Sequence, residues 1–268
     1  MQINEAENLR RTRSIDKMAK EIGTVLSDCV PSIYLYGSCV LGDFKLGWSD
    51  IDILVLTQRQ ISQEQAEKLV VLRQFMLQTE PNNLYYRSIE GGMLTLSAFL
   101  TKQPDRVVYW GTSGQRITDT YHFDSFCMTE LVESGILLYG EDVRRWMKNP
   151  DYSQLYTDVK NHYDTIRKYV QQSDRSLYSF GWFLDIARCI YTLQTGKIIA
   201  KTDAGAWALE NNLCPTPEAL EMAFKIRCHP MKYKNEPAVL DYAETLGPDI
   251  QRFADVLERE FKESTNIG

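Results

Sequence analysis

Asp50 and Asp52 are the residues whose type and spacing best fit a chemical role in this chain. Residues two positions apart on a β-strand point to the same face, so both carboxylates project together. Neighbouring carboxylates repel each other unless a cation lies between them. Hard oxygen ligands of this kind suit Mg²⁺, which takes one or two protein carboxylates and completes its shell with water and phosphate oxygens. The spacing therefore predicts a magnesium site.

A Gly-Ser turn, Gly37-Ser38, precedes the two acids. Glycine lets the backbone approach a ligand closely, and the serine offers a backbone N–H and a hydroxyl to a phosphate oxygen. Each signal by itself is weak, because an Asp-x-Asp commonly marks a solvated strand end and a Gly-Ser marks a turn. Together, and flanked by the apolar runs 33–36 and 51–56, they predict a site for a metal and a nucleotide.

The pattern Gly37-Ser38, a spacer at 39–49 and Asp50-Ile51-Asp52 resembles the signature of the nucleotidyltransferase superfamily that includes DNA polymerase beta. A second region is similar to the C-terminal helical domain of aminoglycoside (3'')(9) adenylyltransferases, which inactivate streptomycin and spectinomycin by transferring AMP. The resemblance covers most of the chain, in order and at similar spacing. It implies ATP as a substrate and two Mg²⁺ ions held at Asp50 and Asp52. The second region comprises Thr195-Gly196-Lys197-Ile198, Lys201 and Ala204–Ala208.

The resemblance also implies a catalytic base. Relatives carry a Glu in an Arg-x-apolar-Glu stretch, and the segment 87–90 matches it, which makes Glu90 the candidate that deprotonates the acceptor hydroxyl. The sequence then departs from the family, because Gly91-Gly92 replaces a β-branched strand. Such glycines bulge or loosen a strand and would alter where Glu90 points. The alternative is that Glu90 is a solvated turn residue.

Further candidates lie in the second half of the chain. Lys201 stands where relatives carry a phosphate-contacting lysine, and an exposed loop lysine is the alternative. Carboxylates and aromatic rings hold cationic sugars, which makes Trp110, Trp182 and Asp185 candidates for acceptor binding. Relatives carry an acidic residue in the segment corresponding to 178–181. This chain has none there, and Asp185 or Asp174 would have to substitute.

The composition of the chain limits which classes of molecule it is expected to bind. The chain has 268 residues, is 44% hydrophobic and carries a net charge of −6. A nucleic-acid-binding protein usually has a strongly basic face, and none is evident, so we expect no nucleic-acid partner. An acidic cleft concentrates cationic ligands, which favours a cationic, aminoglycoside-like small molecule. No apolar run approaches the length of a membrane span, the opening segment lacks a secretory pattern, and six dispersed cysteines without a C-x-x-C pair fit a cytoplasmic protein.

The hydrophobic patterning predicts two domains. Residues 1–148 are expected to form an α/β nucleotidyltransferase domain, a mixed sheet with flanking helices, and residues 149–268 a helical bundle that binds substrate and nucleotide. Two domains suffice to form a cleft, so a monomer is consistent with this organisation. Helices are expected at 4–28, 63–77, 152–171, 177–194, 204–211, 217–227 and 237–263, and strands at 33–36, 51–57 and 93–100, with a helix near 127–131 and a short strand ending at Gly140.

The leading functional hypothesis is a Mg²⁺-dependent enzyme that transfers AMP from ATP to a hydroxyl of an aminoglycoside or aminocyclitol antibiotic and thereby confers resistance. Two alternatives remain open at this point. The same fold modifies proteins in toxin–antitoxin pairs, so the acceptor would then be a polypeptide. A chain whose Glu90 does not reach the metal would bind a nucleotide without turnover.

Overall fold

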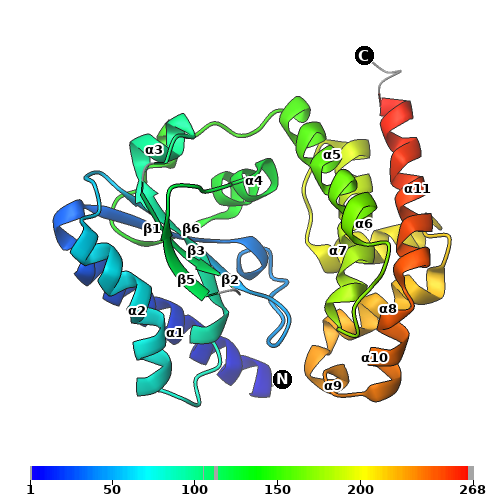
Figure 1. Cartoon of the computed structure of the whole chain (residues 1–268), viewed down its shortest axis with the longest axis horizontal. Coiled ribbons are helices and arrows are strands. Elements are labelled where there is room, and N and C mark those ends of the chain that lie inside the picture. Colours follow the sequence, from blue (N-terminus) through cyan, green and yellow to red (C-terminus); the bar gives the residue numbers. More distant parts are fainter. Residues whose placement is uncertain (1, 105, 112–113, 265–268) are drawn as a thin grey trace. The chain divides into compact units, whose positions relative to one another are not determined.

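The computed structural model describes residues 2–104, 106–111 and 114–264. The chain forms two compact units (Figure 1). The first comprises residues 1–40, 50–123 and 130–149, and the second comprises residues 41–49, 124–129 and 150–268. The change of unit at 149/150 lies close to the boundary expected from the sequence. However, two short segments of the N-terminal half, 41–49 and 124–129, pack with the second unit.

The first unit is built on a six-stranded mixed sheet, as the sequence predicted. Its strand order is β5-β4-β3-β2-β1-β6. β2 and β3 are parallel, and the other neighbouring pairs are antiparallel. β1 and β2 are buried along almost their whole length, which explains their continuous apolar runs. The strands are β1 (Pro31–Tyr36), β2 (Ile51–Thr57), β3 (Ile89–Thr95), β4 (Val107–Gly111), β5 (Gly114–Thr118) and β6 (Ile136–Tyr139).

Helices α1 (Gln2–Val25) and α2 (Gln63–Thr79) lie side by side against this sheet (Figure 1). α1 packs on β1 and β6, and α2 packs on β4 and β5. The start of α2 is fixed by a capping box, in which Ser62 and Gln65 each bond the other's backbone amide. Helix α4 (Ser125–Ser134) follows the sheet hairpin and leads into β6, as expected from the sequence.

The expected strand at 93–100 is wrong in its second half. β3 ends at Thr95, and helix α3 (Leu96–Thr101) follows. Thr95 is the N-cap of this helix, because its hydroxyl oxygen accepts a hydrogen bond of 3.2 Å from the amide N–H of Ala98. A short apolar run does not distinguish a buried strand from a buried helix, so the sequence pattern missed the change. It also missed the short strands β4 and β5.

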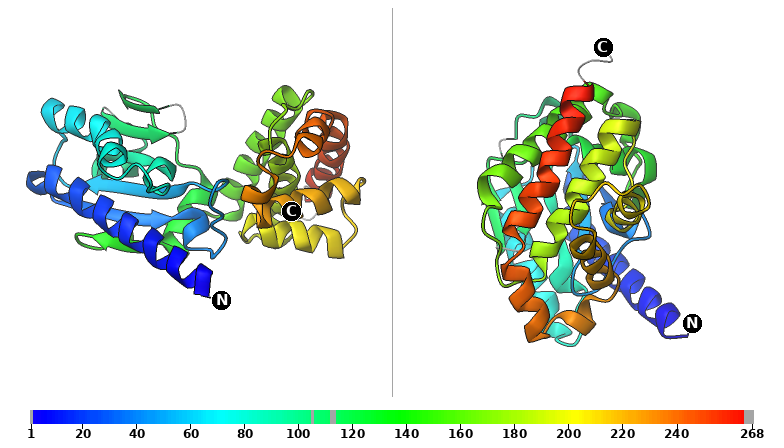
Figure 2. Two further views of the ribbon diagram at one scale, coloured as in Figure 1. Left: turned by 90° about the horizontal axis from the view of Figure 1, so that it is seen from below. Right: turned by 90° about the vertical axis from the view of Figure 1, so that its right-hand side faces the viewer.

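The second unit is a helical bundle, as expected (Figure 2). Its central helix α6 is apolar on nearly every face, and the rings of Phe180 and Phe183 are fully buried among the other helices. α6 ends at Gly196, whose φ of +67° is the left-handed conformation that closes many helices. The helices are α5 (Tyr152–Tyr169), α6 (Tyr178–Thr195), α7 (Lys201–Glu210), α8 (Pro217–Cys228), α9 (Pro230–Tyr233), α10 (Pro237–Glu244) and α11 (Gly247–Ser264).

The single helix expected at 237–263 is two helices. α10 ends at Glu244, and α11 begins at Gly247. Pro248 has no amide hydrogen and would clash with the preceding turn of a continuous helix, whereas the first turn of a new helix accepts it. Gly247 also fits closely here, because a Cβ built on it would overlap the carbonyl oxygen of Gln171.

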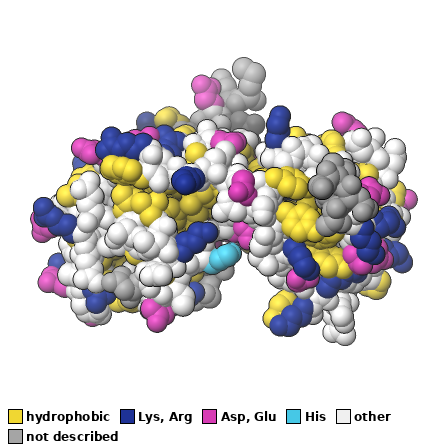
Figure 3. Space-filling model, turned by 90° about the horizontal axis from the view of Figure 1, so that it is seen from above, with side chains coloured by type: hydrophobic (Ala, Val, Ile, Leu, Met, Phe, Trp, Pro, Cys, Tyr) yellow, Lys and Arg dark blue, Asp and Glu magenta, His cyan; other side chains and the backbone are white. Residues whose placement is uncertain are grey.

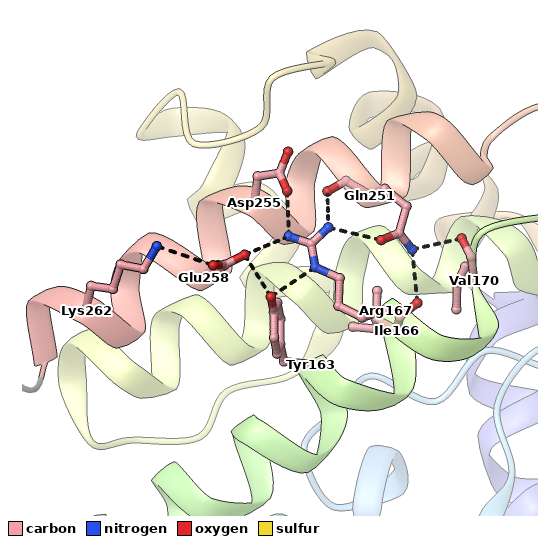
Figure 4. Close-up of polar contacts among 8 residues, drawn as sticks. All are labelled: Tyr163, Ile166, Arg167, Val170, Gln251, Asp255, Glu258 and Lys262. Carbon is pink, nitrogen blue, oxygen red and sulfur yellow. Dashed lines mark hydrogen bonds and ion pairs between the residues drawn. The ribbon is translucent and has the colours of Figure 1, made fainter.

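A polar network fastens α11 to α5 (Figure 4). Arg167 on α5 donates to Asp255, to Glu258 and to the carbonyl and side chain of Gln251. Tyr163 donates to Glu258 at 2.8 Å and accepts from Arg167 at 3.1 Å. One guanidinium therefore serves most of the polar groups between these two helices.

Replacing Arg167 with Met should lower the free energy of unfolding by about 1–3 kcal/mol, because several charge-assisted hydrogen bonds are lost at a partly buried site. Urea denaturation followed by circular dichroism measures this. Arg175→Met is the matched control, since its ion pair with Asp241 is solvent-exposed. The control substitution should lower the free energy of unfolding by less than about 0.5 kcal/mol. Equal losses in the two variants would contradict the assignment of the network.

The surface carries both signs of charge. On the face drawn in Figure 3, Lys and Arg side chains are dispersed among Asp and Glu rather than gathered in one stripe. All six cysteines are free. Among the described residues, no helix combines the length and apolarity needed to span a membrane.

Candidate active site

The Gly-Ser motif forms a tight turn directly after β1. Residues Gly37–Cys39 make one turn of 3₁₀ helix, closed by a hydrogen bond of 3.1 Å from the amide of Val40 to the carbonyl of Gly37. Gly37 has φ +72°, a conformation that residues with a Cβ rarely adopt. The Ser38 hydroxyl donates to the carbonyl of Asp50 at 3.4 Å. This contact ties the turn to the start of β2, so the two halves of the motif are neighbours in space.

Asp52 lies beside this turn. It is the second residue of β2 and is paired with Tyr36, the last residue of β1. A Cβ built on Gly37 would overlap the carboxylate of Asp52, so the glycine is required by close approach as well as by its φ. Asp50 stands one position before β2 begins, and it is therefore at the strand entrance rather than on the strand. Both carboxylates are partly exposed.

Gly37→Ala should reduce catalytic efficiency by about 100-fold, because the added methyl displaces the Asp52 carboxylate and small displacements of catalytic groups have effects of this size. Gly42→Ala is a closely matched control. Gly42 has φ +71°, but nothing lies within 4 Å of its Cβ position. The control carries the same backbone strain without the overlap. Steady-state kinetics of the two variants would refute the role of this contact if both lost activity equally.

Glu90 is paired with Asp52 across the parallel strands β2 and β3. Opposed residues in a parallel pair project their side chains to the same face of the sheet, so Glu90 joins Asp52. The predicted loosening at Gly91-Gly92 is not observed, because the register runs without a shift from Ile51 and Ile89 to the ends of both strands. Gly91 is needed for another reason. Its φ is +149°, and a Cβ would overlap the carbonyl oxygen of Ile53.

The charges of the three acids all affect the pKa of Tyr109 on β4. Burial raises the pKa of the Tyr109 hydroxyl, and the negative charges of Glu90, Asp50 and Asp52 raise it further. Arg116, whose guanidinium lies 4.6 Å from the centre of the Tyr109 ring, opposes this change. A single hydroxyl therefore senses the charge of all three carboxylates.

A buried arginine supports the strand that carries Glu90. Arg73 on α2 is 5% exposed and donates to the carbonyl of Ile89 at 2.7 Å and to the carbonyl of Gly111 at 3.0 Å. Burial lowers the pKa of Arg73, whereas the charges of Glu90 and Asp50 raise it. Arg73 thus fixes the backbone next to Glu90 and places a positive charge behind the acids.

The donor set fits a partly protein-bound magnesium ion. Within the described ranges, no three His, Cys, Asp or Glu side chains are grouped closely enough to hold a metal by themselves. Mg²⁺ does not require such a group, because it commonly binds one or two carboxylates and takes its remaining ligands from water and substrate phosphates. Asp50 and Asp52 provide that number at one strand entrance.

In the second unit, Lys201 and Asp185 form an ion pair. Lys201 is the first residue of α7, and its Nζ lies 2.7 Å from Oδ1 of Asp185 on α6. Arg188, one turn further along α6, lies 3.8 Å from the same oxygen. Burial raises the pKa of the Asp185 carboxyl, but the positive charges of Lys201 and Arg188 outweigh it, and the pKa is lowered. Asp185 is thus an ionised partner of two cations.

The two tryptophans proposed for acceptor binding differ in exposure. Trp110 is 0% exposed, and its indole N–H donates a hydrogen bond of 3.0 Å to the carbonyl of Leu69 on α2. A fully buried ring offers no face on which a sugar could stack, so we do not retain Trp110 as an acceptor-binding residue. Trp182 is partly buried and packs against the core of the helical unit. It remains a candidate.

Sequence reasoning missed three residues near these groups: Arg73, Tyr109 and Arg188. A signal existed for Arg188, which stands three positions after Asp185 on a predicted helix and therefore shares its face. Tyr109 is adjacent to Trp110, and alternation along a strand would have placed one of the two on the opposite face. No local pattern marks Arg73, because its partners are carbonyl groups distant in the sequence.

Comparison with known proteins finds two family matches in this chain. The nucleotidyltransferase domain family matches residues 15–90, which include the Gly-Ser turn and all three acids. The family "aminoglycoside adenylyltransferase, C-terminal domain" matches residues 148–228, which include Asp185 and Lys201.

A similar solved structure is the spectinomycin adenyltransferase AAD(9) from Enterococcus faecialis, crystallised with ATP and spectinomycin. It is 18% identical, with a TM-score of 0.64, and the match covers 92% of this chain and 99% of that one. This likeness establishes the fold. The chain therefore carries a nucleotidyltransferase domain at residues 15–90 and an aminoglycoside adenylyltransferase C-terminal domain at residues 148–228.

Proposed function

We propose that this enzyme transfers AMP from ATP to a hydroxyl group of an aminoglycoside or aminocyclitol antibiotic, with Mg²⁺ bound at Asp50 and Asp52. The observation that carries the proposal is the register of β2 and β3, which pairs Glu90 with Asp52 on one face of the sheet. Two ligand carboxylates and a third acid beside them are the groups that hydroxyl-directed nucleotidyl transfer requires. The spectinomycin bound to the structural neighbour supports the acceptor class.

Each residue has a role in this scheme. Asp50 and Asp52 would hold the magnesium, which would supply positive charge to the triphosphate and to the leaving pyrophosphate. The turn at Gly37 and Ser38 presents its amide and hydroxyl to the phosphates. Glu90 accepts the proton of the acceptor hydroxyl, whose oxygen then bonds to the α-phosphorus as the bond to pyrophosphate breaks. Lys201 contributes positive charge to the phosphates.

The two remaining candidates come from α6. Because Asp185 already pairs with Lys201 and Arg188, we propose that it orients Lys201 as well as facing a cationic acceptor. Trp182 lies three positions earlier on the same helix and shares that side of it. We propose that Trp182 contacts the acceptor.

Pyrophosphate release tests the proposal. The full chain with ATP and Mg²⁺ is assayed against streptomycin, spectinomycin, a kanamycin-type aminoglycoside, a lincosamide and no acceptor. Release that depends on one of the aminoglycoside or aminocyclitol compounds is the expected result. Silence across the panel, with ATP still raising the melting temperature, would refute the antibiotic acceptor. Mass spectrometry of co-expressed proteins would then look for an added AMP.

A further inference from the structure

The spacer between the two halves of the motif carries a buried carboxylate that the proposed chemistry does not use. Asp43 stands five positions after Ser38 and seven before Asp50, and it belongs to the helical unit. It is only 4% exposed. A carboxylate buried to this degree persists only where cations and hydrogen-bond donors replace the lost water. Its partners therefore indicate why it is retained.

Asp43 contacts Arg227, Thr202 and, at 3.5 Å from its Oδ1, the Nζ of Lys45. Arg227 on α8, itself 3% exposed, donates from Nη2 and Nε to Oδ2 of Asp43 at 2.7 and 3.1 Å. The Thr202 hydroxyl donates to Oδ1 at 2.5 Å, and the Thr202 amide donates to Oδ2 at 3.3 Å. Burial alone would raise the pKa of Asp43, but these partners lower it, so the carboxylate is ionised.

Asp43 also caps α7 from a distance. The residue at the N-cap position is Ala200, whose side chain cannot accept a hydrogen bond. The first amides of a helix need acceptors and favour a negative charge, and the Asp43 carboxylate provides both at Thr202. Lys201 is the adjacent residue and the first of the helix. The carboxylate from the spacer therefore holds the turn on which Lys201 stands.

We propose that Asp43, Arg227 and Thr202, here called the spacer latch, are positioning residues for nucleotidyl transfer. The latch fastens the first turn of α7, and with it Lys201, to residues 41–49 of the same unit. This inference rests on the proposed function, because it takes Lys201 to contact the phosphates of ATP. The spacer carries none of the motif residues. The inference nevertheless assigns it a role in positioning Lys201.

Three variants and one control test the latch. Thr202→Val removes one hydroxyl and no charge, Asp43→Asn removes the carboxylate charge, and Lys201→Met removes the proposed phosphate contact. Arg167→Met is the control, because it breaks a polar network of the same unit between α5 and α11 (Figure 4). ATP affinity is measured by calorimetry with Mg²⁺, alongside the melting temperature, kcat and the KM values of ATP and acceptor.

The latch predicts a loss specific to the nucleotide. Thr202→Val and Asp43→Asn should reduce kcat/KM for ATP by about 10- to 100-fold, as expected for a displaced binding group, and leave the acceptor KM unchanged. Arg167→Met should lower the melting temperature and leave ATP affinity unchanged. Since the latch acts through Lys201, adding Thr202→Val to Lys201→Met should cause no further loss.

Other results would overturn the inference. A folded Thr202→Val variant with wild-type ATP affinity and kcat/KM would show that the ion pair only stabilises the helical unit. The same conclusion follows if the losses of Thr202→Val and Lys201→Met simply add. If Asp43→Asn does not fold, Thr202→Val decides alone. If the wild-type chain binds ATP but uses no acceptor, the proposed function fails, and the calorimetric comparison still decides the latch.

Discussion

Asp52→Asn is expected to abolish nucleotidyl transfer while leaving the protein folded. Asp52 supplies one of the two carboxylates at the start of β2, and a bound metal contributes several kcal/mol of charge stabilisation at the transition state. Each 1.4 kcal/mol is a factor of ten in rate, so we expect kcat/KM to fall at least about 1000-fold. Pyrophosphate release as a function of Mg²⁺ concentration measures this loss.

The stability of the same variant separates catalysis from folding. In the absence of metal, neighbouring carboxylates repel each other, so neutralising one should leave the melting temperature in EDTA unchanged or higher. The stabilisation that Mg²⁺-ATP gives the wild type should be lost. Asp28→Asn, which neutralises an exposed carboxylate of the same unit, is the control for net charge. A normal rate in Asp52→Asn would overturn the metal assignment.

Glu90→Gln is expected to lower kcat by about 100- to 10,000-fold, the range typical of removing a general base. The amide keeps the shape of the side chain but cannot accept the proton of the acceptor hydroxyl. ATP binding should survive, because Asp50, Asp52 and the Gly-Ser turn remain. Stopped-flow or steady-state assays at saturating ATP measure the change in kcat.

The pH profile gives a second readout. In the wild type, kcat should fall at low pH as the base becomes protonated, and this limb of the profile should disappear in Glu90→Gln. Glu90→Asp, which retains a carboxylate but shortens the side chain by one methylene, should keep the limb at a reduced rate. A Glu90→Gln enzyme with a near-normal rate would show that another group is the base.

Some features of the site follow from local sequence. The Gly37-Ser38 turn was predictable because a tight turn is a property of neighbouring residues. The strand that carries Asp52 was predictable from its apolar run, whereas Asp50 lies one position before that strand begins. The strands β1 and β2 and most helices were predictable for the same reason, since apolar periodicity reports which face is buried. The expected helix at 237–263 failed because one proline outweighed the periodicity around it.

Other features depend on residues that are distant in the sequence. The pairing of Glu90 with Asp52 is set by strand register, and the two glycines after Glu90 suggested a disturbance that the register does not show. Trp110 looked like a binding surface, yet packing under α2 buries it completely. Whether an aromatic residue is core or platform depends on what covers it, and periodicity does not contain that information.

The sequence alone therefore indicated the reaction class of this protein, because the Gly37-Ser38 turn and the carboxylates of Asp50 and Asp52 lie within sixteen residues. Only the tertiary structure decided which groups support them. Arg73 donates to the carbonyl of Ile89, and Arg227 donates to Asp43; both contacts join residues that are distant in the sequence. A buried charge needs a partner of opposite charge or a hydrogen-bonding group. The fold decides which residue is that partner, and no local pattern in the sequence identifies it.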